Sequence, residues 1–259
     1  MKSPEKNLAG ILEDPANVAP ATLKDALVEC IEGGIAHLTP EEALKFLFSL
    51  DNSLYEFQGR MSVAYDGGIH TKHRHTKYHD FFTDRIGKDE QVLDLGCGIG
   101  ALAFDIAERS GAIVVAIDLN EYHLEFAKSR YAHPRITYVL GDVLSTDFSG
   151  DFDTVVMSNV LEHLNKRPAF LKRVSHVTRT SRYLIRVPSF ERDWRVPLKK
   201  ELGMEYRLDP THYTEYTLES FHEEMSEAGL DITYLESRWG EIWAEVIPVP
   251  IHSIDSETA

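Results

Sequence analysis

The chain has 259 residues and a formal net charge of −15, and 43% of its residues are hydrophobic. This length and composition predict one large globular domain with an appendage. The acidic charge argues against nonspecific binding to nucleic acid or anionic lipid, and the apolar runs are too short to span a bilayer. Two cysteines, Cys30 and Cys97, are too few for a disulfide framework, and the first residues lack the apolar core of a signal peptide. We therefore expect a cytoplasmic protein.

Two helices are predicted in the first part of the chain. Residues 21–31 have helical spacing, and we expect Gly33 and Gly34 to end that helix. A second helix begins after Thr39, because Thr39 is followed by a proline and, three residues later, by Glu42. Two helices are too few for a core of their own, so we expect residues 1–85 to form a helical cap beside the site.

The segment 70–79 combines four histidines with three lysine or arginine residues in an otherwise acidic chain. Lys72, His73 and Arg74 favour a site for a carboxylate or phosphate of a cofactor or acceptor. The imidazoles could instead bind a metal, or the segment could be a solvated helix start whose aromatic residues pack on a sheet. We expect the anion site and no metal.

A strand, a glycine loop and a helix follow one another from residue 92 to residue 107. Gly96, Gly98 and Gly100 allow a ligand close to the backbone, and the N-terminus of the following helix offers free N–H groups. Cys97 lies inside this loop and is expected to be a small buried filler. The spacing also fits a dinucleotide loop, which leaves NAD as an alternative cofactor.

Further motifs follow in order. An apolar run ends in Asp118, about twenty residues after the loop, where a carboxylate can accept ribose hydroxyls. The next run ends in Gly141 and Asp142, and a fourth leads into residues 158–164. Over residues 90–188 the chain resembles the class I S-adenosylmethionine-dependent methyltransferases.

This resemblance implies a Rossmann-like, doubly wound α/β fold over residues 86–259, with a seven-stranded sheet whose terminal strand is reversed. It also implies S-adenosylmethionine as the cofactor. The residues that the family would use for it are Asp94 for the methionine end, Gly96, Gly98 and Gly100 in the loop, Asp118 for the ribose, Leu119, Asp142 and Val143 for the adenine, and Asn159 near the sulfonium.

After a fifth strand at residues 182–188, the segment 189–216 is rich in charged and aromatic residues and is expected to be an irregular substrate lid. Tyr213 in this lid is a candidate substrate contact. Thr217 then caps a helix that Gly229 ends, and two final strands follow at residues 232–235 and 241–247.

Methyl transfer requires alignment and, for a hydroxyl acceptor, removal of one proton. His163 and His212 are the candidate bases, because histidine titrates near neutral pH. We expect O-methylation of a small, anionic or sugar-like acceptor. An NAD-dependent oxidoreductase and a regulatory protein that binds S-adenosylmethionine without turnover are the alternatives.

Overall fold

The computed structural model describes residue 11 and residues 13–249. The start of the chain, on which the prediction about a signal peptide depends, lies outside these residues. In the part of the chain that is described, no helix is both long enough and apolar enough to cross a membrane.

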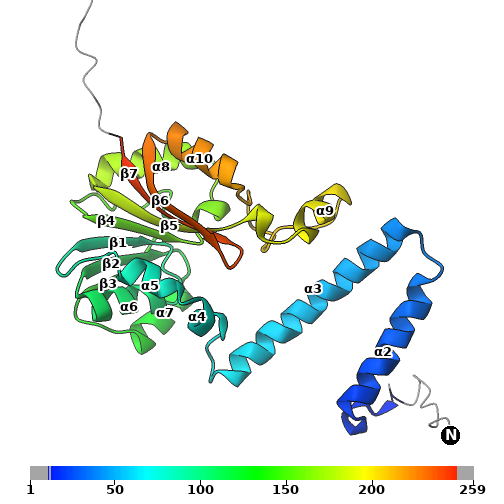
Figure 1. Cartoon of the computed structure of the whole chain (residues 1–259). Helices are drawn as coiled ribbons and strands as arrows, with labels where there is room; N and C mark the ends of the chain where they lie inside the picture. Colours follow the sequence, from blue (N-terminus) through cyan, green and yellow to red (C-terminus); the bar gives the residue numbers. More distant parts are fainter. Residues whose placement is uncertain (1–10, 12, 250–259) are drawn as a thin grey trace, which may run out of the picture. The chain divides into compact units, whose positions relative to one another are not determined.

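The chain divides into two compact units, of which one ends at Met61 and the other begins at Ser62. The first unit contains the short η1 (Pro15–Asn17), α2 (Pro20–Ile35) and most of α3 (Pro40–Tyr65) (Figure 1). The predicted cap of α3 is confirmed, because the Thr39 N–H donates to the Glu42 carboxylate at 2.9 Å. The predicted end of α2 is wrong. Both glycines before Ile35 stay within the helix, since neither adopts the left-handed backbone that would end it.

The second unit is built on a seven-stranded sheet in the order β3-β2-β1-β4-β5-β7-β6. The first five strands are parallel, and β7 is antiparallel to both of its neighbours. The predicted doubly wound sheet with a reversed terminal strand is therefore confirmed. The strands are β1 (Gln91–Leu95), β2 (Ile113–Asp118), β3 (Ile136–Leu140), β4 (Thr154–Ser158), β5 (Arg182–Pro188), β6 (Leu230–Arg238) and β7 (Glu241–Pro248).

Helices cover both faces of this sheet (Figure 1). One layer contains α5, α6 and α7, and the other contains α8 and α10. The helices of this unit are α4 (Lys72–Thr76), α5 (Tyr78–Thr83), α6 (Ala101–Asp105) with the π-type turn η2 (Ile106–Ser110), α7 (Glu121–Arg130), α8 (Arg167–Thr178), α9 (Arg195–Glu201) and α10 (Leu218–Glu227), and the 3-10 turns are η3 (Leu161–His163) and η4 (Phe190–Arg192).

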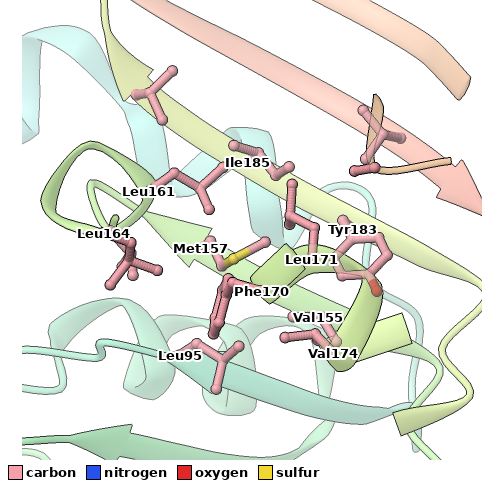
Figure 2. Packing of buried hydrophobic residues seen from close by; sticks show 14 of the residues in the cluster. Leu95, Val155, Met157, Leu161, Leu164, Phe170, Leu171, Val174, Tyr183 and Ile185 are labelled. Carbon is pink, nitrogen blue, oxygen red and sulfur yellow. The ribbon is translucent and has the colours of Figure 1, made fainter. Parts of the chain in front are cut away.

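The core has two parts, one on each side of the sheet. Figure 2 shows the part under α8, where Phe170 and Leu171 pack with strand residues such as Met157. The strands read as continuous apolar runs because both faces of the sheet are covered. On the other face, Tyr78 and Phe82 belong to the second part of the core. The aromatic residues of the histidine-rich segment therefore pack on the sheet, and this segment lies in the second unit rather than with the N-terminal helices.

The segment 189–216 is not irregular throughout, because it contains η4 and α9. Backbone hydrogen bonds anchor its first residues: the Ser189 N–H donates to Gly240, and the Phe190 N–H donates to Tyr216 at 2.7 Å. The predicted cap of α10 is confirmed, since the Thr217 and Ser220 side chains form a reciprocal capping box.

Candidate active site

The strand order reverses between the neighbouring strands β1 and β4, because the chain continues from β1 to β2 on one side and from β4 to β5 on the other. A ligand crevice is expected at the carboxyl ends of strands at such a reversal. The glycine loop after β1 packs directly against the turn after β4. A Cβ on Gly96 would lie 2.6 Å from Val160, and Gly96 has a φ of 73° that favours glycine. A Cβ on Gly98 would instead meet nothing within 4 Å, so this part of the loop is open to a ligand.

Asp94 lies at this crevice with an unsatisfied carboxyl group. Its side chain is buried in β1, and its Oδ2 has no hydrogen-bond partner. Burial, together with the negative charge of Asp118, raises the pKa of Asp94 to about 7. A buried carboxyl that lacks a donor suits a cationic ligand group such as an ammonium.

Asp118, the last residue of β2, has its carboxylate fixed by two backbone donors. The Gly98 N–H donates to Oδ2 and the Asn120 N–H donates to Oδ1, each at 2.8 Å. Each oxygen keeps a lone pair for a further donor, as two ribose hydroxyls would require.

The residues predicted to bind adenine lie at the ends of the neighbouring strands. Asp142 is exposed and accepts the Leu144 N–H at 2.8 Å, so it also forms the turn after β3. Val143 is buried, and the side chain of Leu119 is 73% exposed, which leaves it free to cover a ligand ring.

Asn159, after β4, has a φ of 57° and a buried Oδ1 without a partner. Its N–H donates to the Arg186 carbonyl at 2.8 Å, which holds the turn in this conformation. An unpaired buried oxygen is costly, so Asn159 is a candidate for contact with a bound ligand.

His163 and His212, which lie far apart in the sequence, are brought together. Their ring centroids are 4.4 Å apart and the rings meet edge to face at 85°. The Tyr213 N–H donates to the Glu162 carbonyl at 2.7 Å, which ties the lid to η3. Burial, then the neighbouring His212, lowers the pKa of His163. The Tyr213 ring itself is 66% exposed.

Glu162 completes this group. One ligand atom from each of Glu162, His163 and His212 lies within 4.8 Å of the others, which makes the three side chains a candidate metal-binding group. The sequence prediction did not include Glu162, although its position beside His163 on a turn between buried leucines was a signal.

The histidine-rich segment does not act as one cluster. Burial, and then the positive charge of Arg186, lowers the pKa of Lys72, and the negative charge of Glu241 opposes this effect. The ring of His73 lies 5.2 Å from the Tyr78 ring, and burial, then His79, lowers the pKa of His73 to about 4. Arg74 instead lies 3.5 Å from the Asp66 carboxylate in an exposed pair.

A buried ion pair was missed by the sequence prediction. The Arg186 guanidinium donates to both carboxylate oxygens of Glu241 at 2.6 Å and to the Ser158 hydroxyl at 3.0 Å. It also lies 3.8 Å from the centre of the Tyr78 ring. A charged residue inside the apolar run of β5 was the available signal.

A cavity of about 620 Å³ lies beside the glycine loop but does not contain its carboxylates. Residues of segment 68–80 line it together with α6, η2 and α7, for example Phe104, Arg109 and Arg130. Because neither Asp94 nor Asp118 lines this cavity, it is distinct from the crevice described above.

Comparisons with known proteins agree with this geometry. A family profile described as "Methyltransferase domain" matches residues 92–181. Ubiquinone biosynthesis O-methyltransferase of Rhodopseudomonas palustris (strain BisB5) is 32% identical over 118 residues, which cover 45% of this chain and 46% of that protein. Ribosomal protein L11 methyltransferase of Thermotoga neapolitana (strain ATCC 49049 / DSM 4359 / NBRC 107923 / NS-E) is 32% identical over 126 residues, which cover 48% and 45%. The chain spans about half the length of these curated relatives.

The solved structure of magnesium protoporphyrin IX methyltransferase from Synechocystis PCC 6803, with bound SAH, is similar in fold. Its TM-score is 0.53 at 18% identity, and the match covers 67% of this chain and 83% of that one. All three proteins are methyltransferases, which favours S-adenosylmethionine over NAD as the ligand of the glycine loop. The matching profile shows a methyltransferase domain over residues 92–181, and the strand order and glycine loop are those of the class I S-adenosylmethionine-dependent methyltransferases, so S-adenosylmethionine is the cofactor that these comparisons support.

Proposed function

We propose that this chain transfers a methyl group from S-adenosylmethionine to a hydroxyl oxygen of a small, anionic or sugar-like acceptor. The observation that carries this proposal is the group of two imidazoles and one buried carboxyl, His163, His212 and Glu162, on the turn and lid beside the glycine loop. An acceptor hydroxyl must lose its proton, and these are the groups that can assist that loss.

The cofactor is held by side chains at the ends of three strands. Asp94 binds the methionine ammonium, which supplies the donor that its buried Oδ2 lacks. Asp118 accepts the ribose hydroxyls, and Asp142 with the Val143 N–H binds the edge of the adenine. Asn159 would lie beside the sulfonium, where a positive centre would compensate its unpaired amide oxygen.

Bound S-adenosylmethionine supplies a methyl carbon that is already strongly electrophilic. The chain therefore has to align the acceptor and accept its proton. The lowered pKa of His163 keeps that imidazole neutral near neutral pH, so its lone pair is available to assist the loss of that proton. The positive charge of Lys72 favours an anionic group on the acceptor.

Oxygen as the acceptor atom is supported by the relative that is an O-methyltransferase. A second relative acts on a ribosomal protein, so a protein acceptor is the competing outcome of the test. Placement in the cytoplasm and a capping role for the N-terminal helices are further parts of this proposal.

The test supplies the purified chain with methyl-labelled S-adenosylmethionine and two acceptor pools, one of small hydroxy acids, phenols and sugars and one of peptides. Mass spectrometry then locates the label. We expect it on an oxygen of a small molecule. Label on peptide nitrogen would overturn the acceptor class, and a failure to bind S-adenosylmethionine would overturn the proposal as a whole.

A further inference from the structure

The turn that carries Glu162 and His163 is rigidly supported. Leu161 and Leu164 flank these two residues and are buried in the core, as Figure 2 shows. The third residue, His212, is buried in the lid, and the hydrogen bond from the Tyr213 N–H to the Glu162 carbonyl joins the two segments. The three side chains are therefore held in place by backbone and core contacts.

Hydrogen bonds determine which ring nitrogen of each histidine is free. The Thr211 hydroxyl lies 2.9 Å from His163 Nδ1 and donates its own proton to Asp209 at 2.7 Å. Because that proton is used, Thr211 can only accept from His163, so His163 carries its proton on Nδ1 and presents the lone pair of Nε2.

The same reasoning applies to His212. Its Nδ1 lies 3.0 Å from Oε1 of Glu215, whose side chain is fully buried and is also paired with Arg192. A carboxylate held by an arginine accepts the Nδ1 proton, which leaves the His212 Nε2 lone pair free. An imidazole whose other nitrogen is bound to a carboxylate or hydroxyl is the usual arrangement of a metal ligand.

Glu162 is the carboxyl member of the group. It is completely buried, and neither of its carboxylate oxygens has a hydrogen-bond partner. The nearby Arg186 is already bound to Glu241 and Ser158, so it does not satisfy Glu162. A buried carboxylate without a partner is strongly unfavourable unless a cation compensates it.

We propose that Glu162, His163 and His212 bind one divalent transition-metal cation such as Mn²⁺, Fe²⁺, Co²⁺ or Zn²⁺. Two neutral imidazoles and one carboxylate suit these ions, and three protein ligands leave positions open for an oxygen ligand, as catalytic metal sites do.

The role of the metal rests on the proposed function, whereas its binding does not. An acceptor hydroxyl bound to the cation becomes more acidic and loses its proton to water. The methyl–oxygen bond then forms as the methyl–sulfur bond breaks, and the thioether leaves as a neutral group. In this arrangement the two imidazoles are ligands, and the cation takes over the task of making the hydroxyl acidic.

The test uses tag-free protein that has been treated with a chelator and dialysed. Co²⁺ is added, and its visible absorption reports its coordination number and geometry and so follows binding. We expect one saturable site per chain. Glu162→Gln and His163→Ala should weaken Co²⁺ binding by about 100-fold or more, since loss of outer contacts alone costs about 10- to 100-fold. Thr211→Val, which removes such an outer contact, should weaken it by about 10-fold.

His176→Ala is the matched control, because His176 is exposed on α8 and is not one of the three grouped residues. Binding of S-adenosylmethionine is measured by calorimetry in the same preparations. If wild-type protein shows no saturable Co²⁺ site, or if Glu162→Gln and His163→Ala bind Co²⁺ as the wild type does, the metal site is refuted. If Co²⁺ binds but S-adenosylmethionine does not, the proposed function fails while the metal site stands.

Discussion

Replacement of Asp94 by asparagine should change folding stability and cofactor binding in opposite directions. The pKa of Asp94 is raised by burial from an ordinary 3.8 to about 7, so the folded protein keeps a proton that the unfolded chain has lost. Between these two values the stability of the wild type falls as the pH rises, and above pH 7 this loss is constant. At about 1.36 kcal/mol per pKa unit, the loss reaches about 4 kcal/mol.

Asp94→Asn removes this penalty. We expect the variant and the wild type to have similar free energies of unfolding near pH 4, and the variant to be more stable by up to about 4 kcal/mol at pH 8. Because the asparagine no longer offers a charge to the methionine ammonium, affinity for S-adenosylmethionine should fall by about 1.5–3 kcal/mol, or roughly 10- to 150-fold.

Urea denaturation at several pH values measures the first effect, and calorimetric titration with S-adenosylmethionine at pH 8 measures the second. Asp147→Asn is the control, because Asp147 is exposed and bonds only to Ser149 in a surface turn. The reasoning is refuted if Asp94→Asn is less stable than the wild type at pH 8, or if it binds S-adenosylmethionine equally well.

Three further predictions follow from single groups. Asp118→Ala should weaken S-adenosylmethionine binding by about 1–3 kcal/mol in calorimetry, because the ribose hydroxyls lose their acceptor; unchanged affinity would exclude this role. His163→Ala and His212→Ala should lower kcat by about 10²–10⁴ while cofactor affinity is kept, because both side chains assist the loss of the acceptor proton; variants with the wild-type rate would contradict this. Glu224→Ala should lower the free energy of unfolding by about 3 kcal/mol in urea denaturation, because it leaves Arg167 and the Tyr216 hydroxyl without their buried partner; a loss below about 1 kcal/mol would show that the network contributes little.

The parts of the fold that depend on local signals were predictable. Apolar runs bounded by turns located the strands, and the Thr39 and Thr217 caps located the starts of two helices. The glycines after residue 32 were misread, because glycine permits a helix to end without requiring it. The helix inside the lid was missed because aromatic and charged residues without clear periodicity carry no strong helical signal.

Residues of the candidate site were predictable only where the end of a single strand determines their position. Asp94, Asp118 and Asn159 each follow from their place at the end of a strand. The pairing of His163 with His212, and that of Arg186 with Glu241, depend on how the lid packs and on the register between β5 and β7. Such long-range contacts have no local pattern, so the sequence could suggest the residues but not the partners.

The claim that the methyl group is transferred to an oxygen atom is most directly tested by the ¹³C chemical shift of the product methyl group. The protein is incubated with S-adenosylmethionine labelled with ¹³C at the methyl carbon and with the small-molecule acceptor pool, and the shift identifies the atom that received the methyl group. We predict a methyl group bonded to oxygen, formed by the wild type and lost in Asp118→Ala at limiting cofactor. A methyl group bonded to nitrogen or carbon, or no transfer although the cofactor binds, would contradict the account.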